Sequence, residues 1–333
     1  MKQKILGQFF TKKNIFKNKI FQSWFNSINE EYKKDIVEPF AGKNGLIDML
    51  DELGFINSFQ SFDIEPQHEK VKQHDSILSF PEGFHVCITN PPFLAKNVAS
   101  RKNIPVLIEP FSDLYEKCLD LCLKNCKYVA AIVPESFIVS PFFKSRLYAV
   151  ISLTSKSLFQ HTEHPVCLAL FNPEKYTDFL VYQDEIFLGK YNEQMSKINN
   201  WLKVDSEYNI TFHDKNGDVG LFNIDATNIE KAIHFTLGDL IEPKDVGYHA
   251  RLRTRIKVLS PSSQPLNKTQ LNSFIKSCNK TLLEYREQTN DIFLTSFKGL
   301  RSDGVYRRRL DYSTARLIVA KAYSIHFKKQ LQQ

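Results

Sequence analysis

The residues Phe84-His-Val-Cys-Ile-Thr-Asn-Pro-Pro-Phe93 combine a short apolar run with a polar loop that contains two consecutive prolines. The run Phe84–Thr89 is rich in residues that favour strands, and it ends at a strong turn signal, which predicts a short strand. The prolines fix φ and stiffen the loop after it. An Asn-Pro-Pro-Phe pattern also occurs in ordinary turns, so the neighbouring segments decide its meaning.

The side chains of this loop suit chemistry on an exocyclic amine. Such an amine, for example adenine N6, is a poor nucleophile because its lone pair is delocalised into the ring. The side-chain oxygen of Asn90 and the carbonyl oxygen of Pro91 can each accept one amino hydrogen, which favours a pyramidal nitrogen with a directed lone pair. Pro92 stiffens the loop, and Phe93 offers a face on which a base can stack. These four residues are the candidate catalytic residues.

Two segments upstream have the pattern of a nucleotide-binding α/β domain. Asp35–Gly45 predicts a buried strand that ends in a small-residue loop, and the apolar spacing of Leu46–Leu53 predicts a helix. A ligand can approach backbone N–H groups where such a helix begins. Ser58–Pro66 then predicts a second strand that ends on an acid. Asp63, with Glu65 as second choice, is placed to accept hydrogen bonds from ribose hydroxyls.

A third acid follows further along the chain. His74-Asp75 precedes another apolar stretch, and a carboxylate at that strand end can accept a hydrogen bond from the exocyclic amine of a cofactor's adenine. Each acid taken alone is more typical of a loop or a helix cap. The ordered set of Gly-rich loop and acids favours a cofactor site.

Taken in this order, the segments resemble the gamma-type N6-adenine DNA methyltransferases, which depend on S-adenosylmethionine. Leu6–Thr11 is similar to the family's segment that touches the methionine end of the cofactor, Glu38–Gly45 to its cofactor loop, and Asn90–Phe93 to its catalytic motif. Tyr128–Phe137 resembles the family's next strand and turn. The resemblance covers residues 5–173.

The resemblance implies a class I methyltransferase-like α/β fold with a doubly wound, mostly parallel sheet. Residues 1–180 would form the catalytic domain that binds S-adenosylmethionine. Residues 181–333 would form a basic target-recognition domain of mixed α+β structure that binds duplex DNA. The implied activity is site-specific methylation of N6 of an adenine flipped out of the duplex. A cognate restriction endonuclease is a candidate partner.

The resemblance also implies particular site residues. The cofactor-binding residues would be Thr11, Glu38, Pro39, Phe40, Ala41, Gly42, Asn44, Gly45, Asp63, Ile64, Asp75 and Ser76. The flipped base would stack between Phe93 and a second aromatic residue. Phe159 is favoured by its spacing to the predicted strand Pro165–Phe171, with His161 and His164 as alternatives. Asn44 departs from the family's Gly-x-Gly pattern, but Asn tolerates positive φ better than most residues.

Composition agrees with a two-domain protein. The chain has 333 residues and a 42% apolar fraction, which is ample for a substantial core. No run approaches the ~18 consecutive apolar residues of a membrane span, and Lys2–Ile20 is too polar for a signal peptide. We therefore expect a cytoplasmic protein without a membrane partner.

The six cysteines have neither metal-site nor disulfide spacing. Cys118, Cys122 and Cys126 recur every four residues along Asp113–Lys127, which puts them on one face of a predicted helix. This spacing predicts buried packing, and no metal site is expected.

The net charge of +7 is concentrated in the last part of the chain. Residues 245–333 contain 17 Lys and Arg against 6 Asp and Glu, a net +11, whereas residues 1–244 carry a net −4. Arginines bind phosphates and can reach guanine edges, so contact with nucleic acid is predicted. The candidate DNA-binding residues are Arg251, Arg253, Arg255, Lys298, Arg301, Tyr306, Arg307, Arg308 and Arg309.

The remaining segments give structural predictions. Ile210–Phe222 is predicted as a hairpin around Asn216-Gly217. The nearby acids faintly resemble a calcium loop, but Val219 occupies the position that needs Gly, which favours a structural turn. Helices are predicted over Leu266–Arg286 and Ser313–Leu331.

Other functions share the Asn-Pro-Pro-aromatic motif. Enzymes that methylate glutamine N5 on translation factors lack an extended C-terminal domain, so the basic residues 245–333 disfavour them. RNA adenine-N6 methyltransferases remain an alternative because a basic tail binds either polymer. Intact Asn90, Asp63 and Asp75 disfavour a catalytically inactive DNA-binding protein. Cytosine N4 is a lesser alternative, since Ser more often opens that motif.

Overall fold

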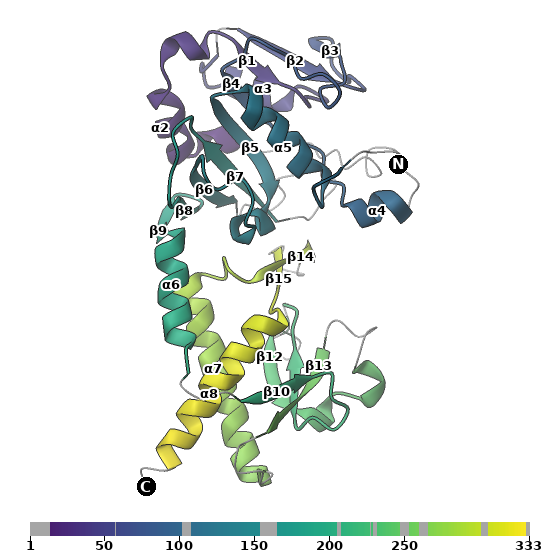
Figure 1. Ribbon diagram of the computed structural model, residues 1–333, viewed down its shortest axis with the longest axis vertical. Coiled ribbons are helices and arrows are strands. Elements are labelled where there is room, and N and C mark those ends of the chain that lie inside the picture. Colours follow the sequence, from purple (N-terminus) through teal and green to yellow (C-terminus); the bar gives the residue numbers. More distant parts are fainter. Residues whose placement is uncertain are drawn as a thin grey trace. The chain divides into compact units, whose positions relative to one another are not determined.

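The computed structural model describes residues 14–56, 58–101, 108–153, 165–204, 208–226, 228, 232–246, 253–259, 266–300 and 306–330. The chain divides into two compact units, residues 1–192 and 193–333 (Figure 1). No helix within the described ranges combines the length and the apolar character that a membrane crossing requires.

The first unit contains a nine-stranded sheet with the order β3-β2-β1-β4-β5-β7-β6-β8-β9. Its strands are β1 (Ile36–Glu38), β2 (Phe59–Asp63), β3 (Val71–Gln73), β4 (Val86–Thr89), β5 (Tyr128–Pro134), β6 (Leu147–Leu153), β7 (Val166–Phe171), β8 (Leu180–Gln183) and β9 (Ile186–Lys190). β7 runs antiparallel to both neighbours, whereas β3, β2, β1, β4 and β5 are parallel. This confirms the predicted doubly wound, mostly parallel sheet of the class I methyltransferase type.

The strands β8 and β9 extend the large sheet beyond β6, to which β8 pairs in parallel. The sequence prediction placed residues 181–192 in the second domain. In the structure these residues belong to the first unit, because β9 completes a hairpin with β8.

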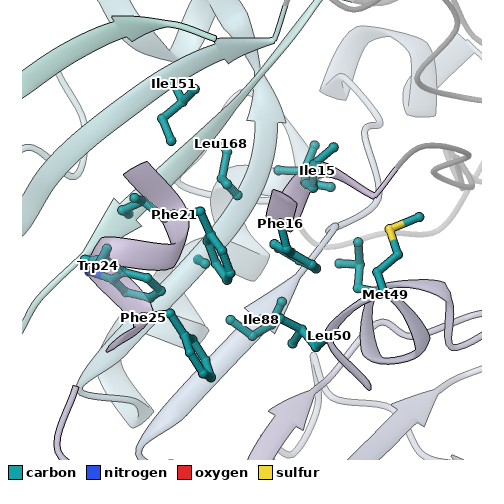
Figure 2. Packing of buried hydrophobic residues seen from close by; sticks show 14 of the residues in the cluster. Ile15, Phe16, Phe21, Trp24, Phe25, Met49, Leu50, Ile88, Ile151 and Leu168 are labelled. Carbon is teal, nitrogen blue, oxygen red and sulfur yellow. The ribbon is translucent and has the colours of Figure 1, made fainter. Parts of the chain in front are cut away.

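The helices of the first unit cover the sheet. They are η1 (Ile15–Lys17), α2 (Lys19–Ser27), η2 (Glu30–Lys33), α3 (Gly45–Asp51), α4 (Lys96–Arg101), α5 (Leu114–Asn125) and η3 (Glu135–Val139). On one face, Phe16, Phe21 and Phe25 are fully buried and pack with Leu50 of α3 and Ile88 of β4 (Figure 2). Burial of each large side chain contributes about 1.5–3 kcal/mol before entropy is counted.

Helix α5 covers the opposite side of β4. Cys87 of β4 contacts the thiols of Cys122 and Cys126, while its neighbour Ile88 faces the aromatic cluster. All six cysteines are unbridged and buried, which confirms the prediction of buried packing. Asp113 caps α5, and Glu116 completes a capping box that starts the helix where the spacing predicted it.

The second unit pairs a four-stranded antiparallel sheet with long helices, which confirms the mixed α+β prediction. Its strands are β10 (Asn209–Phe212), β11 (Val219–Phe222), β12 (His234–Leu237), β13 (Arg253–Leu259), β14 (Thr295–Leu300) and β15 (Tyr306–Arg309). Its helices are α6 (Tyr191–Leu202), which begins at the division, η5 (Gly238–Leu240), η6 (Pro243–Asp245), α7 (Lys268–Thr289) and α8 (Tyr312–Gln330). The core of this unit includes Leu221, Ile256, Phe274 and Ile318.

The predicted hairpin over residues 210–222 is wrong. The sheet order is β10-β13-β11-β12, so β13 lies between the two strands that were expected to pair. The loop from β10 to β11 instead crosses β13. A Cβ on Gly217 would come within 2.7 Å of the backbone of Ile256, so glycine is required there for the close approach rather than for a tight hairpin turn.

Candidate functional site

Polar residues gather where the parallel strands of the large sheet end. β1 ends at Glu38, β2 at Asp63, and β4 at Thr89, which precedes Asn90. β1 lies between β2 and β4 in the sheet, and all three run in the same direction. The strand order also reverses at β1, and ligands of open α/β sheets bind at the carboxyl ends beside such a reversal. The predicted cofactor and catalytic segments therefore lie on one edge.

The loop after β1 is held in a left-handed conformation. Gly42 has φ 51° and Asn44 has φ 65°, so Asn44 adopts the positive φ that its position requires. The Ser61 hydroxyl donates to Asn44 Oδ1 over 2.5 Å, and Asn44 Nδ2 donates to Asp48 over 3.0 Å. Pro39 and Phe40 form the turn before it, Ala41 is buried, and Gly45 begins α3. These hydrogen bonds hold the loop at the sheet edge.

Asp63 ties this loop to the loop after β2. Its Oδ2 accepts a hydrogen bond from the Gly42 N–H and its Oδ1 from the Glu65 N–H, both at 2.8 Å. Burial raises the pKa of Asp63, and these two hydrogen bonds act in the opposite direction. Each oxygen has a second lone pair for a ligand. The following residues, Ile64 and Glu65, are exposed.

Several buried polar atoms lie at these strand ends. Glu38 Oε2, Ser76 Oγ and Thr89 Oγ1 have no hydrogen-bond partner among the residues that the structure describes. Such atoms cost about 1–3 kcal/mol each when buried unsatisfied. Asp75 is partly committed, since its Oδ1 accepts from the N–H groups of Ile77 and Leu78. The orphaned acceptors and hydroxyls fit a polar ligand with amino and hydroxyl groups.

Glu38 is the most perturbed carboxyl group at this edge. Burial, and then the charges of Asp63 and Asp48, hold its pKa well above its ordinary 4.5. The folded state therefore binds the proton more tightly than the unfolded state, and stability falls as pH rises above 4.5 toward the raised pKa. A cation placed beside Glu38 would favour its ionised form.

We expect Glu38→Gln to stabilise the ligand-free protein at pH 8 by about 1 kcal/mol, because a buried amide neither carries a charge nor has to take up a proton on folding. At pH 4, where Glu38 is protonated in both states, the advantage should vanish. Urea unfolding at the two pH values measures the difference. An unchanged difference between variant and wild type would show that Glu38 does not titrate as its burial implies.

The start of α5 contacts the Asn90–Phe93 loop and the residue that follows it. Asn90 and Phe93 are half-buried and Pro91 is buried. The Leu94 N–H donates to Asp113 Oδ1 over 2.9 Å, and the Phe93 ring meets Tyr115 edge-on, with centroids 6.0 Å apart. Sequence reasoning did not assign Asp113 or Tyr115 to the site, although the capping pattern from Asp113 to Glu116 was visible.

Some predicted site residues lie outside the described residues, so their assignment to the site stays a prediction. They are Thr11, Phe159, His161, His164, Arg251 and Arg301. Lys298 and Tyr306 lie on β14 and β15, where only their backbone is described.

The basic residues of β13 share one face, because the intervening Thr254 and Ile256 are buried. Arg253 pairs with Asp245 at 3.2 Å and Lys257 with Asp218 at 2.8 Å. Arg255 differs from both, since its guanidinium donates to the carbonyl oxygens of Ile241 and Lys215. Arg255 therefore braces two loops of the second unit.

The arginines of β15 divide between two faces. Arg308 is buried, and burial lowers its pKa to about 10. Arg307 and Arg309 lie on the other face, and the Nε atom of each has no hydrogen-bond partner within the described part of the chain. β15 pairs with β14 as a two-stranded ribbon, and Ile224 bridges the ribbon to the end of β11.

No family model matches the chain, and no curated protein matches it. Similar solved structures include a modification subunit of a putative type I restriction enzyme from Vibrio vulnificus YJ016, with 12% identity over 53% of this chain and 47% of that one and a TM-score of 0.39. A type I restriction-modification methyltransferase subunit from Streptococcus thermophilus has 13% identity over 54% and 48%, with a TM-score of 0.38.

A putative class I S-adenosylmethionine-dependent methyltransferase from Listeria monocytogenes has 16% identity over 58% of this chain and 72% of that one, with a TM-score of 0.38. The chain spans 47% and 48% of the two restriction-modification subunits, about half of their length. Because identity and TM-score are low, the chemistry is inferred from the chain's own residues.

Proposed function

We propose that the chain is a site-specific DNA methyltransferase that transfers a methyl group from S-adenosylmethionine to N6 of an adenine in duplex DNA. One observation carries this proposal. The Asn90–Phe93 loop follows β4 at the sheet edge where β1 and β2 end in Glu38 and Asp63. This arrangement supports the proposal, because acceptors that could bind an amine would lie beside a loop that could bind a nucleoside cofactor.

The residues at the strand ends fit S-adenosylmethionine. Asp63 has acceptor capacity for ribose hydroxyls, Asp75 for the adenine amine, and the buried carboxyl of Glu38 for a cationic group. The loop Pro39–Gly45 would line the bound molecule, together with Ile64 and Ser76, and Thr11 would hold its methionine end. When bound, the cofactor supplies an activated methyl group on a sulfonium.

Asn90 and the Pro91 carbonyl would hold the two amino hydrogens and direct the lone pair of N6 at the methyl group. Phe93 would stack on the base, with Phe159 as the second aromatic. Positioning supplies most of the acceleration, and no nucleophilic residue is required. The proton on N6 can leave to solvent after transfer. Flipping the base costs a few kcal/mol, which stacking and phosphate contacts offset.

Duplex DNA is the substrate we favour, because residues 245–333 carry a net +11. Residues 193–333 would act as the target-recognition domain, through Arg251, Arg253, Lys298, Arg301, Tyr306, Arg307 and Arg309. Arg308, which the sequence also indicated, is buried and is not among the proposed DNA contacts. A cognate restriction endonuclease would be the expected partner. The same charge suits structured RNA, so adenine N6 in RNA is the second candidate.

We expect the double variant Arg307→Ala/Arg309→Ala to weaken duplex binding and to reduce the slope of log affinity against log salt by about 2, one for each lost phosphate contact. Arg255→Ala is the matched comparison. It should lower the melting temperature and leave the salt slope nearly unchanged, because Arg255 is bound to backbone carbonyls. Fluorescence anisotropy at several salt concentrations measures the salt slope of both variants, and thermal unfolding measures their melting temperatures. Equal salt slopes for wild type and the double variant would contradict the assignment.

Tritiated methyl transfer from S-adenosylmethionine tests the proposed function. Unmethylated duplex DNA, total RNA and a protein extract are assayed in parallel, and the product nucleosides are identified. Label in N6-methyladenine from duplex DNA is the expected result. Label confined to RNA or protein would preserve the chemistry and overturn the substrate, and no label in any substrate would overturn the activity.

A further inference from the structure

Phe142 is an exposed aromatic residue beside the catalytic edge. Phe142 and Val139 each retain 46% of their accessible surface. They follow β5, which pairs in parallel with β4 through Ala131 and Thr89, so β5 ends on the same edge as Asn90. Their position at this edge makes them candidates for contact with the substrate.

The backbone next to Phe142 is held in a costly conformation. The next residue, Phe143, has φ 59°, which is a true outlier for a bulky residue and occurs mainly at functional sites. Lys144 closes the turn from the other side, since its Nζ donates to the carbonyl oxygens of Phe137 and Ile138. The Phe142 N–H donates to the Ser140 hydroxyl over 3.3 Å. These hydrogen bonds therefore hold the backbone that carries the exposed Phe142 ring.

A continuous series of contacts links this turn to the catalytic loop. The Phe142 ring lies 6.2 Å from that of Phe143, which lies 5.8 Å from Phe111. Phe111 precedes Ser112 and Asp113, whose backbone pairs with Ala95 and Lys96 just after the catalytic loop. Phe142 is therefore connected to Phe93 through packed and hydrogen-bonded residues.

The surrounding sequence suits a polyanion. There is no Asp or Glu from residue 83 to 108 or from residue 136 to 162. Among the basic residues of these segments, Lys96 pairs with Glu109, and Lys144 and Arg146 donate to backbone carbonyl oxygens. An apolar ring between acid-free segments does not repel phosphates, and it matches a nucleic-acid duplex, whose phosphates flank a stack of apolar base faces.

We propose that Phe142 enters the DNA base stack as a wedge and occupies the gap that the flipped adenine leaves. This inference rests on the proposed function and assigns a residue that stabilises the extruded state without touching the reacting atoms. Apolar side chains inserted between base steps are an established way to offset unstacking. Phe142 is thus a positioning residue for base extrusion, distinct from the Phe93 platform.

The test uses the full chain and a duplex that carries the adenine methylated by the wild type. Phe142→Ala should slow single-turnover methylation about tenfold when that adenine is paired with thymine. Opposite an abasic site, where extrusion needs little help, the variant should come within about threefold of wild type. Phe142→Trp, which keeps a ring, should retain activity on both duplexes.

Phe187→Ala on β9 is the matched control, because Phe187 is 54% exposed at the far end of the sheet order. It should methylate both duplexes like wild type. An unchanged rate for Phe142→Ala on the paired duplex, or an equal loss on both duplexes, would overturn the wedge while leaving the methyltransferase intact. A wild type that methylates no DNA would instead remove the proposed function, and the wedge with it.

Discussion

Asn90→Ala is expected to lower the rate of methyl transfer about 100- to 1,000-fold, the scale of losing one preorganised polar contact to a reacting group. The carbonyl of Pro91 would still accept one amino hydrogen, but the second hydrogen would have no acceptor, and the lone pair of N6 would remain delocalised. Binding of S-adenosylmethionine should change little, because those proposed cofactor contacts that the structure describes lie on the loops after β1, β2 and β3. The rate constant comes from single-turnover transfer of tritiated methyl, and cofactor binding from calorimetry.

Asn199→Ala provides a control, since Asn199 is exposed on α6. It should keep wild-type activity. Asn90→Ala with more than a few per cent of wild-type activity would exclude Asn90 from the mechanism. A parallel loss of cofactor binding would mean that Asn90 serves the cofactor site rather than the methyl acceptor.

The large sheet could be predicted because its local patterns agree with one another. Local sequence patterns are enough to predict three of its elements: the strand before Asn90, the strand that ends at Asp63 and the capped helix at Asp113. The strand pairing of the second unit was harder to predict, because it depends on contacts between residues that are distant in the sequence. Asn216-Gly217 is a strong local hairpin signal, yet β13 lies between the flanking strands. The glycine serves the crossing over Ile256, which no local rule could distinguish from a turn.

For the candidate site, too, the sequence could predict which residue types follow which strands but not what surrounds them. The sequence indicated which acids follow which strands, since that depends on order alone. It could not indicate that the two oxygens of Asp63 accept hydrogen bonds from the loops after β1 and β2. Nor could it indicate that Arg255 donates to backbone carbonyl oxygens, because both features depend on tertiary contacts. Phe142 was overlooked for a related reason, since neither its exposure nor the positive φ of Phe143 has a signature in composition.

Asp63→Asn is expected to raise the dissociation constant for S-adenosylmethionine about 100-fold. Hydrogen bonds to a charged group contribute about 1.5–3 kcal/mol each. An amide offers only one acceptor where the carboxylate offers two, so it loses either the Gly42 or the Glu65 contact together with its charge. The loop after β1 would then lose its tie to β2, and the ribose would lose its acceptor.

Glu65→Gln is the matched comparison, because Glu65 is the other acid at this strand end and is exposed. Its dissociation constant should stay within about threefold of wild type, as for a surface group that contributes little. Equilibrium dialysis with labelled cofactor, without DNA, measures both variants, and circular dichroism checks that each is folded. If Glu65→Gln lost binding while Asp63→Asn kept it, the ribose would belong to Glu65, and Asp63 would be a brace for the loops alone. If both variants bound like wild type, the cofactor would not lie across the ends of β1 and β2, because every ribose acceptor at that edge would have been weakened without effect.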